Sequence, residues 1–395
     1  MKAWIEQVNR EHGTRPFFIY DLDAMAAHLM QFNVPGVKFW YATKANPLSQ
    51  VVRTAFECGF GIDCASAGEF RQALRVGVPP AQILLTGPSK PKKLLKEALQ
   101  AGLKHFVLES VQQVLDLEAL AREMNVKVDA LLRLQIAWTE TESSVLGGGK
   151  VSPFGLDAKG WMSLPLQNFR QVQIRGIHCF QWGNILDSER LLKIWYQTAH
   201  EAKTLASNLN LPLEVLDLGG GLGIPYHGES ALTFEAVQTQ LLRLKQELPQ
   251  TEVWMELGRY AVGPFGNYVT EIVDRKTVQG KEFLVLEGGV HHLVRPALIK
   301  EAFPAEVLGQ TPGLLAKLEY EVHGPLCTSL DHLGTYTFSN EVKAGDQIVF
   351  RQVGAYGFTE SMPFFLCHDL PAEFVIRQQK LLCLREWKTP ETWLV

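Results

Sequence analysis

The chain has 395 residues, of which 46% are hydrophobic and 20% charged, proportions typical of a soluble globular protein. This length exceeds what one ordinary core needs, so we expect two domains. A net charge of −4, early charges at the N-terminus and the lack of a membrane-length apolar run exclude nucleic-acid, membrane and secretory classes and favour a cytoplasmic protein.

The six cysteines are scattered along the chain and never form a Cys-x-x-Cys pair. This spacing argues against a disulfide framework and against a structural zinc site, so no metal is expected. Most of the cysteines are expected to be small buried hydrophobic residues. Only Cys327 lies in a special sequence context.

Between residues 37 and 258 an apolar run, a turn and a helical pattern recur eight times. The runs are Val37–Lys44, Phe60–Ser66, Gln82–Pro88, His105–Ser110, Asp129–Ile136, Ile174–Phe180, Glu214–Gly220 and Glu252–Gly258. Alternating strands and helices predict a parallel sheet, and eight such units are the number that closes a (β/α)₈ barrel. A doubly wound open sheet is the alternative.

After about residue 265, short strand-like runs separated by Gly, Asp and Pro turns predict an all-β domain. The opening segment Pro16–Tyr20 is also strand-like and could pair with that domain, which would make the barrel an insertion. We therefore expect residues 1–26 to join the β domain, residues 27–262 to form the barrel and residues 263–395 to form the rest of the β domain.

Polar and glycine residues gather at the predicted strand ends, where barrel enzymes place their chemistry. They are Lys44, Asp63, Ser66, Glu109, Arg133, His178, Gly219, Gly220, Gly221, Glu256 and Arg259, and the aromatic Phe180 accompanies His178. A lysine closing a buried strand either extends its ammonium into solvent or serves as the amine of a Schiff base. Because so many ends are polar together, we interpret the set as one site.

The run Leu216–Gly223 follows the seventh predicted strand and contains three successive glycines. Glycine N–H groups can approach a phosphate closely, and barrel phosphate sites commonly follow strands seven and eight. Arg259 could add charge there; a tight turn is the alternative. A second glycine run, Gly147–Lys150, fails the P-loop pattern because Val151 follows the lysine, and we interpret it as a loop over the barrel mouth.

Glu256 ends the eighth predicted strand. Such a carboxylate either pairs with a nearby cation or faces the protonated ring nitrogen of a cofactor. A phosphate cradle, a Schiff-base lysine and a carboxylate for a ring nitrogen together describe pyridoxal 5′-phosphate.

With these residues in place, the sequence resembles the fold-type III pyridoxal-phosphate decarboxylases, the group of diaminopimelate and ornithine decarboxylases. The matching segments span nearly the whole chain: Tyr41–Asn46, Asp63–Glu69, Gly176–Cys179, Leu218–Gly221, Glu256–Arg259, Arg295–Leu298, Gly324–Asp331 and Gly354–Tyr356. The resemblance implies an alanine-racemase-like barrel with a C-terminal β domain completed by the N-terminal strand.

The resemblance also implies roles for individual residues. Lys44 would carry the cofactor as a Schiff base, and Glu256 would keep the pyridine nitrogen protonated. Cys327 would come from a second subunit and protonate the substrate carbon after CO₂ leaves, so a homodimer with shared active sites is expected. The other implied cofactor contacts are Asp63, Arg133, His178, Phe180, Gly219, Gly220, Gly221, Gly258, Arg259 and Tyr356.

Departures from the family pattern bear on the substrate. Phe180 stands where a second histidine is common, and Gly183 where a serine is usual. Thr328 follows the expected catalytic cysteine in place of an acid, so a distal substrate ammonium lacks a charged partner. Arg295 is retained at the position expected to hold a substrate carboxylate.

We therefore expect a decarboxylase of a carboxylate-rich, citryl-conjugated or carrier-bound amino acid, as in siderophore or similar pathways. The residues expected to bind substrate are Arg295, His291 with its neighbour His292, Thr328 and Asp331.

Three alternatives remain open. One is a meso-diaminopimelate decarboxylase of lysine biosynthesis. A racemase of the same fold type is disfavoured by Glu256, because related alanine racemases place an arginine opposite the ring nitrogen. A non-catalytic homologue that only binds pyridoxal phosphate is disfavoured by the β domain and by the presence of both Lys44 and Cys327.

Overall fold

The computed structural model describes residues 1–138, 151–180, 182–309 and 316–394. The loop expected at Gly147–Lys150 lies outside the described residues. The chain forms two compact units. One contains Met1–Met25, Tyr226–Glu229 and Val262–Val395, and the other contains Ala26–Pro225 and Ser230–Ala261.

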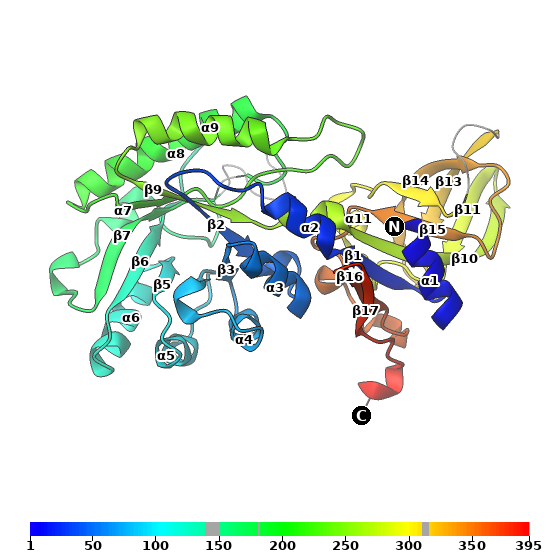
Figure 1. The fold of residues 1–395 in the computed structure, drawn as a ribbon, viewed down its shortest axis with the longest axis horizontal. Helices are drawn as coiled ribbons and strands as arrows, with labels where there is room; N and C mark the ends of the chain where they lie inside the picture. The colour runs from blue at the N-terminus through cyan, green and yellow to red at the C-terminus, as the bar shows by residue number, and fades with distance from the viewer. Residues whose placement is uncertain (139–150, 181, 310–315, 395) are drawn as a thin grey trace. The chain divides into compact units, whose positions relative to one another are not determined.

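The second unit is built on a closed barrel of eight parallel strands in chain order (Figure 1). They are β2 (Val37–Ala42), β3 (Gly61–Cys64), β4 (Ile83–Leu85), β5 (His105–Leu108), β6 (Val128–Arg133), β7 (Val172–His178), β8 (Val215–Asp217) and β9 (Glu252–Leu257). The first strand pairs with the last, with Trp40 opposite Glu256, so the barrel is confirmed and the open-sheet alternative is wrong.

Helices alternate with the barrel strands and surround them (Figure 1). They are α2 (Leu22–Leu29), α3 (Ser49–Glu57), α4 (Ala67–Arg75), α5 (Lys92–Gln100), α6 (Val111–Glu123), α7 (Ala158–Trp161), α8 (Ser188–Asn208), α9 (Phe234–Glu247) and α10 (Arg259–Val262). Local capping fixes where some begin: Ser66 accepts the N–H of Glu69, and the Glu69 carboxylate accepts that of Ala65. The polar end of β3 is thereby held in one conformation.

The barrel interior is a packed apolar layer formed by Trp40, Leu84, Val107, Leu131, Val215 and Trp254. Gly61 and Gly176 allow this packing, since a Cβ at either position would collide with Trp40 or with the backbone of Val215. The layer separates the two ends of the barrel.

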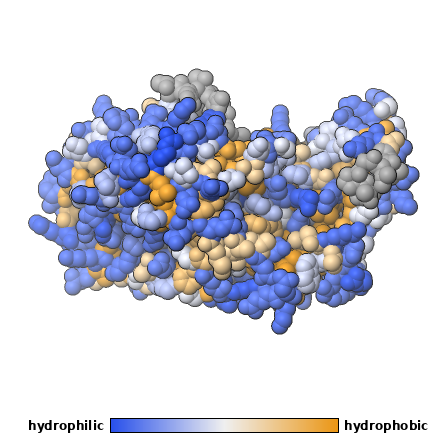
Figure 2. Space-filling view, turned by 45° about the horizontal axis from the view of Figure 1, so that its top comes forward, coloured by the Kyte–Doolittle hydropathy of each residue, from blue (hydrophilic) through white to orange (hydrophobic). Residues whose placement is uncertain are grey.

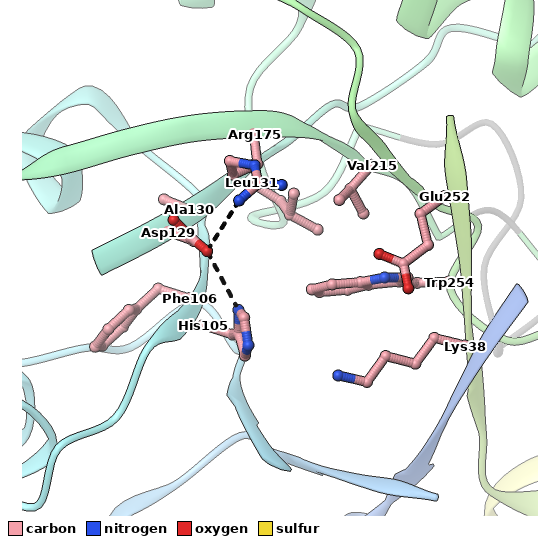
Figure 3. A pocket seen from close by; sticks show the side chains of 10 residues that line it. All are labelled: Lys38, His105, Phe106, Asp129, Ala130, Leu131, Arg175, Val215, Glu252 and Trp254. Atoms are coloured by element: carbon pink, nitrogen blue, oxygen red, sulfur yellow. Dashed lines mark hydrogen bonds and ion pairs between the residues drawn. The ribbon is translucent and has the colours of Figure 1, made fainter. Parts of the chain in front are cut away.

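Charged side chains line a pocket at the amino ends of the strands (Figure 3). Asp129 lies 3.4 Å from Arg175 and 3.9 Å from His105, and the Lys38 ammonium lies 4.0 Å from the centre of the Trp40 ring. Polar residues at this end of a barrel usually serve stability, whereas catalysis occurs at the carboxyl ends of the strands. The active site is therefore expected at the carboxyl ends of the strands.

The other unit is a mostly antiparallel nine-stranded sheet with α1 (Lys2–His12) and α11 (Arg295–Ile299). Its strands are β1 (Phe17–Asp21), β10 (Gly266–Val278), β11 (Lys281–Leu286), β12 (Ala305–Val307), β13 (Lys317–His323), β14 (His332–Ser339), β15 (Gln347–Arg351), β16 (Ala372–Arg377) and β17 (Lys380–Arg385). β1 lies between β10 and β16, pairing Phe17 with Val269 and with Ala372. The predicted completion of the β domain by the N-terminal strand is confirmed.

On the face shown in Figure 2, hydrophilic side chains predominate and apolar side chains form patches between them. One exposed apolar segment is Phe364–Leu366, whose three side chains are between 45% and 59% exposed. In the part of the chain that the structure describes, no helix combines the length and apolarity needed to cross a membrane.

Candidate active site

Lys44 lies just beyond the carboxyl end of β2. The predicted strand included it, but β2 ends at Ala42, and Thr43–Ala45 form a single 3₁₀ turn. The Tyr41 hydroxyl donates to the backbone oxygen of Asn46 at 2.9 Å, which fixes this turn. Thr43 and Ala45 are buried while the lysine side chain is exposed. The turn therefore presents the amine at the barrel mouth.

Three buried polar residues meet at the ends of adjacent strands β7, β8 and β9. One ligand atom each of His178, Asp217 and Glu256 lies within 4.8 Å of the others, and His178 Nε2 lies 3.2 Å from Glu256 Oε1. Burial and the Glu256 charge raise the pKa of Asp217 well above its usual range. Burial also acts to raise the pKa of Glu256, but His178 and Lys44 outweigh it and bring the pKa to about 2. Of the two carboxyl groups, Asp217 and Glu256, the one that carries the negative charge is therefore Glu256.

Several buried atoms of this cluster lack hydrogen-bond partners among the described residues. They are both ring nitrogens of His178, Oδ2 of Asp217 and Oε1 of Glu256. The contact between His178 and Glu256 has ion-pair distance without hydrogen-bond geometry. Buried polar atoms are nearly always satisfied, so this concentration at one barrel end indicates a ligand with polar atoms of its own.

Asp63 adds a further carboxyl group at the end of β3. It is buried and accepts a hydrogen bond from the Thr86 hydroxyl at 2.6 Å. Burial and the nearby Glu256 charge raise the pKa of Asp63 to about 8, whereas the Lys44 ammonium acts in the opposite direction. Asp63 is therefore mainly protonated at neutral pH, which lets its carboxyl group donate as well as accept.

The three glycines that follow β8 could not be replaced by larger residues without a clash or backbone strain. Gly219 and Gly221 have φ values of +62° and +109°. A Cβ on Gly220 would lie 2.6 Å from the Glu256 backbone oxygen, and one on Gly219 would lie 2.9 Å from the Phe180 ring. No acceptor among the described residues engages the N–H groups of Gly220 and Gly221. These N–H groups, with the Phe180 ring beside them, are suited to an anion.

Cations accompany the glycine run on neighbouring strand ends. Arg259 is buried and begins α10 directly after Gly258 and β9, the strand that pairs with β8. Arg133, at the end of β6, lies 2.9 Å from the buried Glu109, so its charge is already balanced.

Lys90 is a residue of this end of the barrel that the sequence analysis missed. It is buried, donates to the backbone oxygen of Gly87, and burial lowers its pKa to about 8. The nearby carboxyl groups of Glu109, Asp63 and Glu256 act in the opposite direction and raise the pKa of Lys90. The signal was available, because Lys90 follows the predicted strand Gln82–Pro88 by two residues.

Arg295 and Tyr356 form a second group, within the β unit. The Arg295 side chain is buried, lies 3.1 Å from Glu360 and sits 5.1 Å from the centre of the Tyr356 ring. Its Nε and its second terminal nitrogen have no hydrogen-bond partner among the described residues. Tyr356 has a φ of +55°, a strained conformation for a tyrosine that is often associated with function.

The two adjacent histidines of the β unit differ in whether their ring nitrogens already have hydrogen-bond partners. His292 contacts the Tyr268 hydroxyl at 2.8 Å and the backbone oxygen of Asp369 at 2.9 Å, so both its ring nitrogens are engaged. His291 has no hydrogen-bond partner among the described residues, and burial lowers its pKa to about 2. Of the two, His291 has unengaged ring nitrogens, and it offers a neutral ring and no positive charge; assistance of the substrate by either histidine stays a prediction.

The loop between β13 and β14 carries Cys327, which is exposed, and Thr328, which is half-buried. Asp331 accepts the N–H groups of Val290 at 2.7 Å and of Leu326 at 2.6 Å. Both of its carboxylate oxygens are thus used inside the β unit. These bonds hold the loop in place, and the substrate contact expected for Asp331 stays a prediction.

The barrel residues fit pyridoxal phosphate. Glu256 supplies a buried anionic oxygen without a hydrogen-bond partner, which suits a protonated ring nitrogen, and the glycine run supplies N–H groups suited to the phosphate. Lys44 supplies an exposed amine at the same end of the barrel. The predicted site residues follow seven of the eight barrel strands, all except β4, and closure of the barrel brings them to one end.

Relatives of known activity share nearly the full length of the chain. The L-glutamyl-[BtrI acyl-carrier protein] decarboxylase of Niallia circulans is 28% identical, with 95% of this chain and 92% of the relative covered. The 2-[(L-alanin-3-ylcarbamoyl)methyl]-2-hydroxybutanedioate decarboxylase of Staphylococcus aureus is 26% identical, with 95% and 98% covered. The diaminopimelate decarboxylase of Bacteroides thetaiotaomicron is 28% identical, with 90% and 94% covered.

Solved structures share the fold. The diaminopimelate decarboxylase of Helicobacter pylori, crystallised with L-lysine, superimposes with a TM-score of 0.87 at 24% identity, covering 98% of this chain and 97% of that one. The family model described as pyridoxal-dependent decarboxylase, pyridoxal binding domain, matches residues 24–263, more than half of the chain. The chain therefore belongs to the pyridoxal-dependent decarboxylases, enzymes whose cofactor is pyridoxal phosphate.

Proposed function

We propose that this decarboxylase acts, as a homodimer, on an amino acid conjugated to a carboxylate-rich group or to a carrier. The observation that carries the proposal is that two features occur together. Arg295 is buried and has two nitrogens without a hydrogen-bond partner among the described residues, and the residue after Cys327 is the uncharged Thr328. Two relatives support it, since one acts on a carrier-bound glutamyl group and the other on a conjugate of a hydroxybutanedioate.

The barrel residues account for cofactor binding. Lys44 would hold the cofactor through its amine, Gly219–Gly221 and Arg259 would hold its phosphate, and Glu256 would hold its protonated ring nitrogen. When bound, pyridoxal phosphate accepts the electron pair that remains on the substrate carbon as CO₂ leaves. Glu256 keeps its negative charge at neutral pH because its pKa is about 2, so it would accept a hydrogen bond from the protonated ring nitrogen.

Cys327 completes the reaction. As the bond between the substrate carbon and its carboxylate breaks, the Cys327 thiol gives its proton to that carbon, and the thiolate recovers a proton from solvent. The thiol belongs to the second chain of the dimer. Its exposure supports this assignment, as does the exposed apolar surface of Leu330 and Phe364–Leu366, which suits contact with another copy.

Substrate choice follows from charge. A distal ammonium would find only the Thr328 hydroxyl where an acid would have given a charge-assisted bond. A distal carboxylate would find Arg295, whose charge is shared with a Glu360 that is itself partly exposed. The neutral His291 can add a hydrogen bond without changing the charge of the site.

Lys44→Ala should abolish stable cofactor binding. We expect native protein purified with pyridoxal phosphate to keep a visible absorption band after gel filtration and the variant to lose it, because the anchoring amine is gone. Lys203→Ala, which removes an exposed lysine on α8, is the control and should keep the band. A native protein that never takes up the cofactor would contradict the assignment of Lys44.

Mixing two inactive variants should restore activity if each site uses both chains. Lys44→Ala and Cys327→Ser proteins, dissociated and reassembled together, should recover about a quarter of native activity, since half of the dimers are mixed and each contains one intact site. Neither variant should recover alone. Absence of recovery, in mixtures shown by mass spectrometry to contain mixed dimers, would place Cys327 in the same chain's site.

Arg295→Ala should weaken use of a carboxylate-rich substrate. Loss of a charge-assisted bond of about 1.5–3 kcal/mol predicts a fall in kcat/KM of about tenfold or more, mainly through KM. Arg351→Ala removes an exposed, ion-paired arginine on β15 of the same unit and should leave kcat/KM unchanged. Equal kinetics for native protein and Arg295→Ala on the preferred substrate would refute the anchoring role.

Thr328→Glu should shift selectivity toward a substrate with a distal amine. We expect kcat/KM for meso-diaminopimelate to rise by about tenfold, because the new carboxylate supplies a charge-assisted partner. Ser329→Glu, which places the same charge one residue further along the exposed loop, should not do so. If native protein already prefers meso-diaminopimelate over every conjugated substrate tested, the diaminopimelate decarboxylase alternative is correct.

A further inference from the structure

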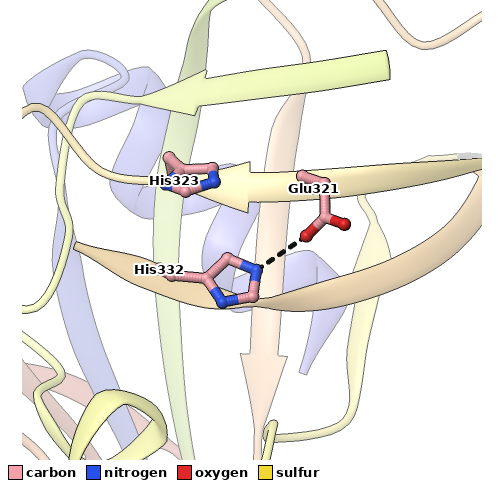
Figure 4. A group of neighbouring side chains, drawn as sticks. All are labelled: Glu321, His323 and His332. Atoms are coloured by element: carbon pink, nitrogen blue, oxygen red, sulfur yellow. Dashed lines mark hydrogen bonds and ion pairs between the residues drawn. The ribbon is translucent and has the colours of Figure 1, made fainter. Parts of the chain in front are cut away.

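Two histidines and a glutamate of the β unit, none of them assigned a role above, lie close together (Figure 4). Glu321 and His323 belong to β13, and His332 begins β14. Residues two apart on a strand project from the same face, so Glu321 and His323 share one side. His332 is the cross-strand partner of His323, next to a register shift after Val322.

The three side chains are close enough to share one ion. His332 Nε2 lies 2.9 Å from Glu321 Oε2, and the ring centres of the two histidines are 4.8 Å apart. One nitrogen or oxygen of each residue lies within 4.8 Å of the other two. All three side chains are half-buried, so an ion could enter from solvent and keep a water ligand.

We propose that Glu321, His323 and His332 bind a divalent transition-metal ion, with zinc as the best match. Two imidazoles, one carboxylate and an open position are a ligand set that zinc accepts. Calcium and magnesium favour sets composed entirely of oxygen ligands. On binding, the ion displaces the hydrogen bond between His332 and Glu321, and both become ligands.

Surrounding side chains are placed to orient the carboxylate. The Thr335 hydroxyl donates to Glu321 Oε2 at 3.0 Å, and Lys281 Nζ lies 3.9 Å from Glu321 Oε1. Outer partners of this kind restrict a ligand's rotation and strengthen metal binding. The lysine side chain is 71% exposed and can turn into solvent when the ion arrives.

The site lies at the two ends of the loop that carries Cys327. His323 precedes Gly324 and His332 follows Asp331, so an ion joining the two histidines closes the base of this eight-residue loop. Asp331 already ties the loop to Val290 and Leu326. Metal binding would restrict the loop further; its effect on catalysis rests on the role proposed above for Cys327.

Calorimetric titration of the cofactor-loaded full chain with ZnCl₂ tests the site. We expect one zinc ion per chain, removable by EDTA, in native protein and in Cys327→Ser, which excludes the loop thiol as the ligand. His323→Gln and His332→Gln should each weaken binding at least about tenfold, whereas His200→Gln, which alters an exposed histidine on α8, should not. Retained cofactor absorbance verifies that each variant is folded.

Two results would overturn the site. One is a native chain that takes up no zinc, a measurement that needs no variant. The other is native-like affinity in His323→Gln and His332→Gln. The titration contains no substrate, so its outcome is separate from that of the decarboxylation assays, and either proposal can fail alone.

Discussion

The pairing of β2 with β9 is the constraint on which the barrel site depends. It closes the sheet and sets Trp40 opposite Glu256, so the first and last strands end side by side. Lys44 follows the first of these strands and Glu256 lies on the last. Without closure, the amine and the carboxylate would stand at opposite edges of an open sheet, more than 200 residues apart in sequence and with no shared ligand.

Electrostatic competition at the barrel mouth selects which carboxyl group stays charged. Glu256, Asp217 and Asp63 are all buried, and three full negative charges in so small a volume would be prohibitively unfavourable. The neighbouring His178 and Lys44 favour charge on Glu256, while the pKa values of Asp63 and Asp217 are raised. The group proposed to face a cationic ring is thus the one kept anionic, and the other two can act as hydrogen-bond donors.

Much of the fold could be predicted because each barrel strand is a short apolar run ending at a polar or glycine residue. Local patterns of this kind depend on residues near in sequence. The helix α1 was not predicted, since it packs only once β1, β10 and β16 have assembled its apolar partners. Two other features could not be predicted either. One is the ion pair between Arg295 and Glu360, 65 residues away, and the other is that both ring nitrogens of His292 have hydrogen-bond partners. Such contacts are set by tertiary packing, which leaves no periodic signal.

The position of β1 has a consequence for how the chain acquires its structure. β1 precedes the barrel in the sequence, yet one of its neighbours is β16, which follows the barrel, and the Tyr20 hydroxyl donates to Glu373, 353 positions further along the chain. The barrel sequence emerges from the ribosome between the two and can close first. Until β16 arrives, one edge of a strand with four fully buried residues stays unpaired. Protection of that edge by a chaperone until β16 is available would set the yield of folded protein.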